Sequence, residues 1–319
     1  MYRAVGPLLD LRRDEVCDIV QAPINPQHMD WCSFAFYDIA FFSWPTFKGV
    51  EQIIHGFHAF GVPVWVDFDD DPWNIKDDNI TKKSFGPDVL KLVENSCELA
   101  DLISVSTEHL RQEVYGPRYG MDKVKVFPNA LNTKMYSYIE KPRKKCILWR
   151  GASGHKQDIM TVMPAILKIQ QEYPDWPWAM VGDPPKEIIE MMGKHPIVKI
   201  PHQHIQTFMN TLLETAAPIQ IVPLQDDTFN KAKSNCSWLE ATWAGSAVLA
   251  PEFLPEFCKP GITTYKDNDD FYEKLKGLIE ASQADRTALV EKSRFEIKKN
   301  YALCEVNKER KKVILGSVR

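Results

Sequence analysis

The sequence predicts an α/β protein of two domains, each built on a doubly wound parallel sheet. Short apolar runs alternate with amphipathic stretches almost throughout the chain, a pattern that is typical of parallel sheets covered by helices. The 319 residues are too many for one ordinary hydrophobic core. Hydrophobic residues make up 44% and charged residues 26%, as in ordinary globular proteins.

The elements follow one another in a regular order. In the first half, strands are predicted at residues 37–43, 63–68, 101–106 and 124–127, with helices at 50–60 and 88–100. In the second half, strands are predicted at 146–149, 178–181, 197–200, 219–223, 247–250 and 263–265. Helices are predicted there at 158–173, 206–216, 237–244 and 269–281, followed by a long charged helical segment at 284–313.

The domain boundary is expected between residues 128 and 145, where the periodic pattern stops. We expect an N-terminal domain over 1–132, a C-terminal domain over 133–300, and a last helix over 301–319 that returns to the N-terminal domain. Doubly wound sheets bind ligands at the carboxyl ends of their strands. Loops from both sheets are therefore expected around one crevice.

Composition narrows the function classes. The net charge of −4 argues against a general affinity for nucleic acid. No apolar run approaches the about 20 residues that span a bilayer, and the N-terminus lacks a signal-peptide pattern. Seven cysteines without a C-x-x-C pair indicate separate thiols in a reducing compartment. We expect a cytoplasmic protein, not an integral membrane protein, with no obligate protein partner.

Four segments carry a resemblance to a known family, and they occur in the family's order. They are ADLISVS at 100–106, VKVFPNALN at 124–132, ILWRGASGH at 147–155 and LEATWAGSAVLA at 239–250. Together they resemble the retaining, family 4 type of GT-B glycosyltransferases. The resemblance implies two Rossmann-like domains that face each other across a cleft, and transfer of a sugar from a nucleotide diphosphate sugar to a hydroxyl acceptor with retention.

The loop that follows the first strand of the second half is expected to bind the diphosphate of the donor. A diphosphate needs backbone N–H groups and a cation to spread its charge. Gly151 and Gly154 permit a tight turn there. The resemblance implies that Arg150, Ser153 and His155 contact the diphosphate or the sugar.

A second donor segment lies before and within the predicted helix at 237–244. The resemblance implies that Glu240 accepts hydrogen bonds from the ribose hydroxyls, facing the ligand and not the core. Family members commonly carry another glutamate eight positions earlier, where this chain has Ala232. Lys233 and Ser234 are therefore expected to contact the phosphates. The nucleotide sugar is a co-substrate, so no cofactor is expected to be required.

An acidic cluster, DFDDD at 67–71, follows an apolar strand. Asp69 or Asp70 is expected to hold the acceptor hydroxyl or to act as a base, unless the cluster only caps a loop. An alternative is a GT-A-type metal-dependent transferase in which Asp67 and Asp69 bind the metal. The histidines at 195–204 lack a carboxylate or thiol that would complete a metal site, so a divalent metal is not expected to be essential.

The acceptor is expected to be a soluble glycan or small molecule, or a 5-hydroxymethylated base in DNA. Compact phage-type glycosyltransferases have a similar short architecture, and a phage protein would act in the host cytoplasm. A DNA acceptor would require cationic side chains that bind its phosphates, and the candidates are Arg12, Arg13, Lys82, Lys83 and Arg111. Candidates for stacking on a sugar or base are Trp31, Trp44 and Trp73. A non-catalytic nucleotide-sugar-binding module and a hydrolysing epimerase remain alternatives, because fold does not fix function.

Overall fold

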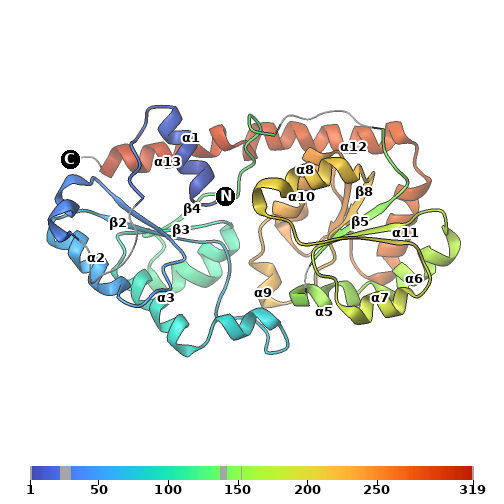
Figure 1. Ribbon diagram of the computed structural model, residues 1–319, viewed down its shortest axis with the longest axis horizontal. Coiled ribbons are helices and arrows are strands. Elements are labelled where there is room, and N and C mark those ends of the chain that lie inside the picture. Colours follow the sequence, from blue (N-terminus) through green and yellow to red (C-terminus); the bar gives the residue numbers. More distant parts are fainter. Residues whose placement is uncertain (1, 22–29, 137–141, 152, 318–319) are drawn as a thin grey trace. The chain divides into compact units, whose positions relative to one another are not determined.

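The computed structural model describes residues 2–21, 30–136, 142–151 and 153–317. The chain forms two compact units. Unit 1 contains Met1–Asn132, Ala232–Ser234 and Ala302–Arg319, and unit 2 contains Thr133–Lys231 and Asn235–Tyr301. Each unit is a parallel sheet flanked by helices (Figure 1).

The sheet of unit 1 has four parallel strands in the order β1-β2-β3-β4. Their bounds are β1 Ala40–Ser43, β2 Val64–Phe68, β3 Leu102–Val105 and β4 Val124–Val126. Ser43 lies opposite Asp67, and Phe68 lies opposite Val105, so the carboxyl ends of three strands meet at one edge. None of the described residues before Ala40 belongs to a strand.

Both faces of this sheet are covered. In β2, Val64, Val66 and Phe68 join one apolar cluster, and Trp65 joins another, as expected when side chains alternate between faces. Helices α2 (Val50–Ala59) and α3 (Pro87–Leu99) lie on one side, and α1 (Val5–Arg13) and α13 (Leu303–Ser317) pack together on the other (Figure 1). Burial on both faces explains why the strand reads as a continuous apolar run.

Three residues from the second half of the sequence are part of unit 1. Ala232 is fully buried in the apolar cluster beneath α2 and α3, and its carbonyl accepts a hydrogen bond from Thr107 Oγ1 at 3.4 Å. Asn129 Nδ2 donates to Ser234 Oγ at 2.7 Å. The residues on either side of Lys233 are therefore hydrogen-bonded to the segments that follow β3 and β4.

The sheet of unit 2 has six parallel strands in the order β10-β9-β8-β5-β6-β7. Their bounds are β5 Ile147–Arg150, β6 Trp178–Val181, β7 Ile197–Ile200, β8 Ile219–Ile221, β9 Ala247–Pro251 and β10 Thr263–Tyr265. The chain moves outward from β5 to β7 and then returns to β8 on the other side of β5. The strand order therefore reverses between β5 and β8, and ligands of such sheets bind at this switch point.

Helices on both faces complete unit 2 (Figure 1). They are α5 Lys156–Met160, α6 Met163–Glu172, α7 Lys186–Met192, α8 Ile205–Thr215, α9 Thr228–Lys231, α10 Cys236–Ala244, α11 Asn268–Glu280 and α12 Gln283–Glu296. Shorter elements elsewhere are α4 Gly116–Tyr119, the 3-10 turns Trp31–Phe36, Ile80–Ser84, Ser153–His155 and Pro255–Phe257, and the π-helical turns Leu110–Tyr115 and Ile297–Tyr301.

Two predicted helices are interrupted. The segment predicted as one helix at 158–173 is α5 and α6, because Pro164 lacks the N–H group that a continuous helix needs and instead lies in the first turn of α6. The segment predicted at 284–313 is α12, a π-helical turn and α13. The break follows Tyr301, where Ala302 bridges to Leu131 and the chain passes from unit 2 to unit 1.

Candidate functional site

Two glycines bring backbone segments close together at the carboxyl ends of β5 and β6. A Cβ atom on Gly151 would lie 2.4 Å from the Trp149 ring, and one on Gly182 would lie 2.6 Å from the Gly151 carbonyl oxygen. Gly182 also has a φ of +107°, which side chains disfavour. Both positions therefore require glycine, because protein atoms occupy the space that a Cβ would need.

Arg150, the last residue of β5, lies at the switch point of unit 2. Its Nη2 donates to Ser237 Oγ at 2.8 Å and lies 2.8 Å from Glu240 Oε2. The guanidinium also lies over the Phe208 ring, 5.4 Å from its centroid. Within the described residues its buried Nε has no hydrogen-bond partner. Arg150 is thus held in place while donor capacity remains for an anion.

Glu240 lies within α10 and is only 2% exposed. The sequence-based expectation that its side chain lies outside the core is wrong, because the helix is buried from Trp238 to Ala244 and Glu240 is paired with Arg150, whereas its contact with the ribose stays a prediction. A buried carboxylate that loses its paired charge is costly for the folded state. Replacing Glu240 is therefore expected to affect stability as well as binding.

His155 is oriented by a buried carboxylate. Its Nδ1 lies 2.8 Å from Asp158 Oδ2, and the carboxylate must accept this hydrogen bond. Asp158 Oδ1 accepts hydrogen bonds from Asn230 Nδ2 at 2.7 Å and from the Gln225 backbone at 2.9 Å. The His155 residue is only partly buried, with 42% of its side chain exposed.

The remaining donor residues predicted after β5 lie in the turn Ser153–His155. Ser153 is exposed and Gly154 is partly buried, in the same turn as His155, while residue 152 lies outside the described residues. In the same unit, a cavity of about 420 Å³ opens beside the carboxyl ends of β6 and β7, lined among others by Gly182, Lys186 and Lys199. Its size is within the range of small-molecule sites.

A second group of predicted residues lies in unit 1, after the carboxyl end of β2. Lys233 Nζ donates to both oxygens of Asp70, at 3.0 and 2.8 Å. Trp44 Nε1 donates to Asp69 Oδ1 at 2.8 Å. Burial raises the pKa of Asp70, whereas the Lys233 ammonium lowers it and the neighbouring aspartates raise it.

Trp44 has an unusual backbone conformation for a large side chain, with a φ of +50°. Strain of this kind tends to persist at functional sites. The other two tryptophans predicted to stack on ligands are engaged by the protein: Trp31 packs edge-on against Phe34, and the Trp73 ring is covered by Arg118 at 4.6 Å. Trp44 is engaged as well, since it packs edge-on against Phe68 and Phe85. It stays a stacking candidate because its ring N–H places it beside Asp69.

Asp67 has a structural role. It is 2% exposed and accepts hydrogen bonds from Arg3, whose Nε lies 3.0 Å away, and from Ser104. Burial lowers the pKa of Arg310 to about 9, and repulsion by the nearby Arg3 contributes to this lowering. A carboxylate enclosed by these partners has no free face for the metal that the Asp67 and Asp69 alternative needs. In the described ranges, no three His, Cys, Asp or Glu side chains gather as a metal site would require.

Sequence reasoning missed several partners at these sites. Ser237 and Phe208, which hold Arg150, carry no sequence signal of that role. Asp158 does carry one, since it follows His155 by three residues and side chains at that spacing meet on a helical turn. The seven cysteines form no disulfide. Within the parts of the chain described above, no helix has the length and apolar character needed to cross a membrane.

Comparison with solved structures identifies the fold. The chain matches GT-B glycosyltransferases. A TarM variant of Staphylococcus aureus in complex with UDP matches with a TM-score of 0.62 and 10% identity over 83% of this chain. Anabaena HepE in complex with UDP and glucose matches with a TM-score of 0.65 and 11% identity, over 90% of this chain and 80% of the HepE chain. Sucrose-phosphate synthase from Thermosynechococcus elongatus matches with a TM-score of 0.61 and 14% identity, over 88% of this chain and 74% of the synthase chain.

The chain spans only 54% of the length of the TarM chain. No protein-family model matches the sequence, and no curated protein is similar to it. The two-sheet architecture and these matches show that the chain has the GT-B fold. The GT-A alternative requires a different fold and is not supported.

Proposed function

We propose that this protein is a glycosyltransferase that moves a sugar from a nucleotide diphosphate sugar to a hydroxyl acceptor, with retention. The observation that carries the proposal is Arg150, held by Ser237 and Glu240 at the switch point of the unit 2 sheet. HepE, which shares the fold, binds UDP and glucose. A fixed cation at this place suits a departing diphosphate.

In the proposed reaction, the bond between the sugar C1 and the diphosphate oxygen breaks, and its electron pair leaves with the diphosphate. The acceptor oxygen forms the new bond to C1 on the same face and loses its proton. Arg150 and His155 stabilise the charge that develops on the leaving group. Asp70, whose charge is balanced by Lys233, holds the acceptor hydroxyl and takes its proton.

We propose a neutral polyhydroxyl acceptor in place of DNA. The candidate acceptor residues are an aromatic ring and two carboxylates, Trp44, Asp69 and Asp70, which suit a sugar and repel phosphates. Two of the cations considered for DNA are already engaged: Arg13 is paired with Asp10, and Arg111 with Glu108. None of these contacts favours the binding of a polyanion such as DNA.

A donor panel tests the proposal directly. The protein is incubated with UDP-, GDP-, ADP- and dTDP-sugars, and release of the nucleotide is measured with and without mixed sugar acceptors. We expect one donor to be consumed, faster when an acceptor is present. Binding of a donor without turnover under all conditions would indicate a non-catalytic module and overturn the proposed transfer.

Glu240→Ala is expected to weaken donor binding by about 1.5–3 kcal/mol, the scale of a hydrogen bond to a charged group. Arg150 loses the carboxylate that orients it, and the ribose loses its proposed acceptor. Calorimetry with the donor found in the panel measures the affinity. Glu240→Gln is the matched control, since it keeps the shape and one acceptor oxygen. Equal donor affinity in the wild type and the folded alanine variant would contradict this role.

A further inference from the structure

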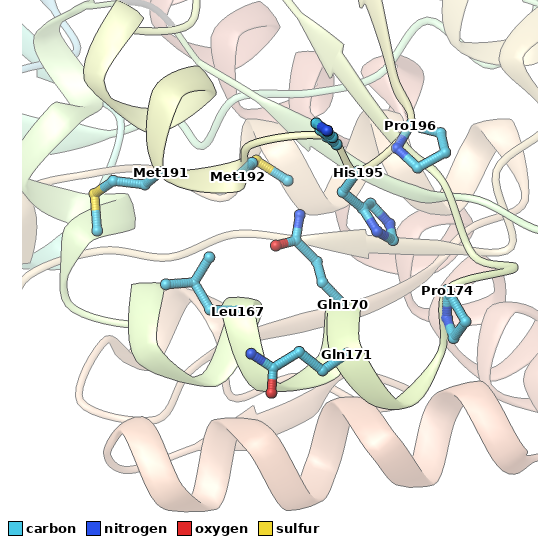
Figure 2. A pocket seen from close by; sticks show the side chains of 9 residues that line it. Leu167, Gln170, Gln171, Pro174, Met191, Met192, His195 and Pro196 are labelled. Atoms are coloured by element: carbon cyan, nitrogen blue, oxygen red, sulfur yellow. The ribbon is translucent and has the colours of Figure 1, made fainter.

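Unit 2 contains another cavity, of about 450 Å³, at the opposite end of its sheet from Arg150 (Figure 2). Pro174 comes before β6, and His195 and Pro196 come directly before β7, so these lining residues lie at the amino ends of the strands. The proposed donor residues follow the carboxyl ends. The cavity is therefore separate from the donor site, and the proposed function does not use it.

Five of the nine residues that line the cavity are apolar. Leu167 comes from α6, Met191 and Met192 come from the end of α7, and Pro174 and Pro196 form the far side. Figure 2 shows these side chains around one hollow. Met192 is 4% exposed, whereas Met191 is 42% exposed and lies at the rim. Flexible methionine side chains adapt to the shape of an apolar ligand.

Gln170 provides a buried polar group in this lining. Its side chain is 8% exposed, and its Nε2 has no hydrogen-bond partner among the described residues. Figure 2 shows the amide reaching from α6 toward the turn that carries Met192 and His195. Buried amide groups are normally hydrogen-bonded, so this one is suited to a ligand that brings an acceptor.

The charge of the lining is positive. Lys194 lines the cavity and is exposed, and the ion pairs of the described residues do not include it. No aspartate or glutamate lines the cavity. His195 Nε2 donates to the Trp176 carbonyl oxygen at 3.0 Å, which fixes the wall beside Lys194. One cation, one unsatisfied amide and apolar walls favour an amphiphilic anion.

We propose that this cavity is a second binding site, for a small carboxylate with an apolar body. The carboxylate accepts hydrogen bonds from Gln170 and pairs with Lys194, while the apolar body packs on Leu167 and Met192. The volume lies within the range of small-molecule sites. Binding of the carboxylate in this cavity does not depend on the proposed transfer reaction.

The test uses 3-phenylpropionate as the probe and methyl-labelled methionine as the reporter. The chain has ten methionines, and Met191→Leu and Met192→Leu variants assign the two signals of interest. We expect saturable shifts of both signals, with a Kd of about 1 mM. Addition of UDP should leave these shifts unchanged. Absence of saturable shifts, or their loss on addition of UDP, would overturn the second site.

Two variants and a matched control probe the chemistry. Gln170→Leu and Lys194→Gln should each weaken 3-phenylpropionate binding by about fivefold, the scale of one hydrogen bond. Lys186→Gln, at the other cavity, should leave binding unchanged. The neutral 3-phenylpropionamide should bind wild type and Lys194→Gln equally. Equal binding of the carboxylate by Lys194→Gln and Lys186→Gln would show that the proposed charge recognition is wrong.

Discussion

Arg150→Ala is expected to lower kcat by at least about 100-fold, the scale of one lost transition-state donor. The guanidinium is held by Ser237 and Glu240 before any substrate binds, so it needs no reorganisation as charge develops on the leaving diphosphate. Its effect should therefore appear in kcat more than in KM. Steady-state turnover with the donor identified by the panel measures it.

Stability needs a control, because Arg150→Ala leaves Glu240 buried without its paired charge. The double variant Arg150→Ala, Glu240→Gln removes that charge and should recover stability but not turnover. Arg143→Ala is a matched control within unit 2: this arginine donates to the Ala244 carbonyl and is expected to keep turnover near that of the wild type. Wild-type turnover in a folded Arg150→Ala protein would remove Arg150 from the site.

The positions of the strands could be predicted because both faces of each sheet are covered. Strand β2 is buried along its whole length, and so are β6, β8 and β9, which makes each a short apolar run in the sequence. Short helices were missed. The seven residues of α7 and the four of α9 complete at most two turns, too few for a periodic pattern to stand out.

The sequence predicts which residues belong to the candidate site but not which side chains pair with one another. Arg150 and His155 are expected together after the first strand of the second half, and the structure has Arg150 as the last residue of β5 and His155 in the turn that follows. Lys233 and Asp70 are 163 positions apart, and Arg3 and Asp67 are 64 apart. Pairs of this kind form only when the chain folds, and no local pattern encodes them. The buried state of Glu240 has the same origin, since it depends on how α10 packs.

The pairing of Lys233 with Asp70 gives Lys233 a role that sequence alone did not predict. Contact of Lys233 with the donor phosphates stays a prediction, whereas its bonds to both oxygens of Asp70 are seen. Burial raises the pKa of Asp70 and Lys233 opposes that shift. Removing Lys233 therefore leaves burial unopposed and should raise the pKa of Asp70 further. A protonated Asp70 cannot accept the proton of the acceptor hydroxyl.

Lys233→Ala is accordingly expected to lower kcat by at least about 100-fold at neutral pH, the scale of a lost general base. The acidic limb of the pH–kcat profile should move to higher pH. Part of the lost kcat should therefore be recovered at alkaline pH. Lys233→Arg keeps the charge and should retain most activity. A loss of kcat that is equal at all pH values would contradict the coupling and favour a direct contact with the phosphates.

The same variant makes a prediction about folding that needs no substrate. A group whose pKa is raised in the folded state binds its proton more tightly there than in the unfolded chain. Its contribution to stability is therefore complete below the unfolded pKa and is lost as the pH rises through the folded pKa. Without Lys233 the pKa of Asp70 is higher, so the variant should lose more stability at neutral pH than at acidic pH. Urea unfolding of wild type, Lys233→Ala and Lys233→Ala, Asp70→Asn across that range measures this, and a pH-independent difference between the first two would exclude the pairing.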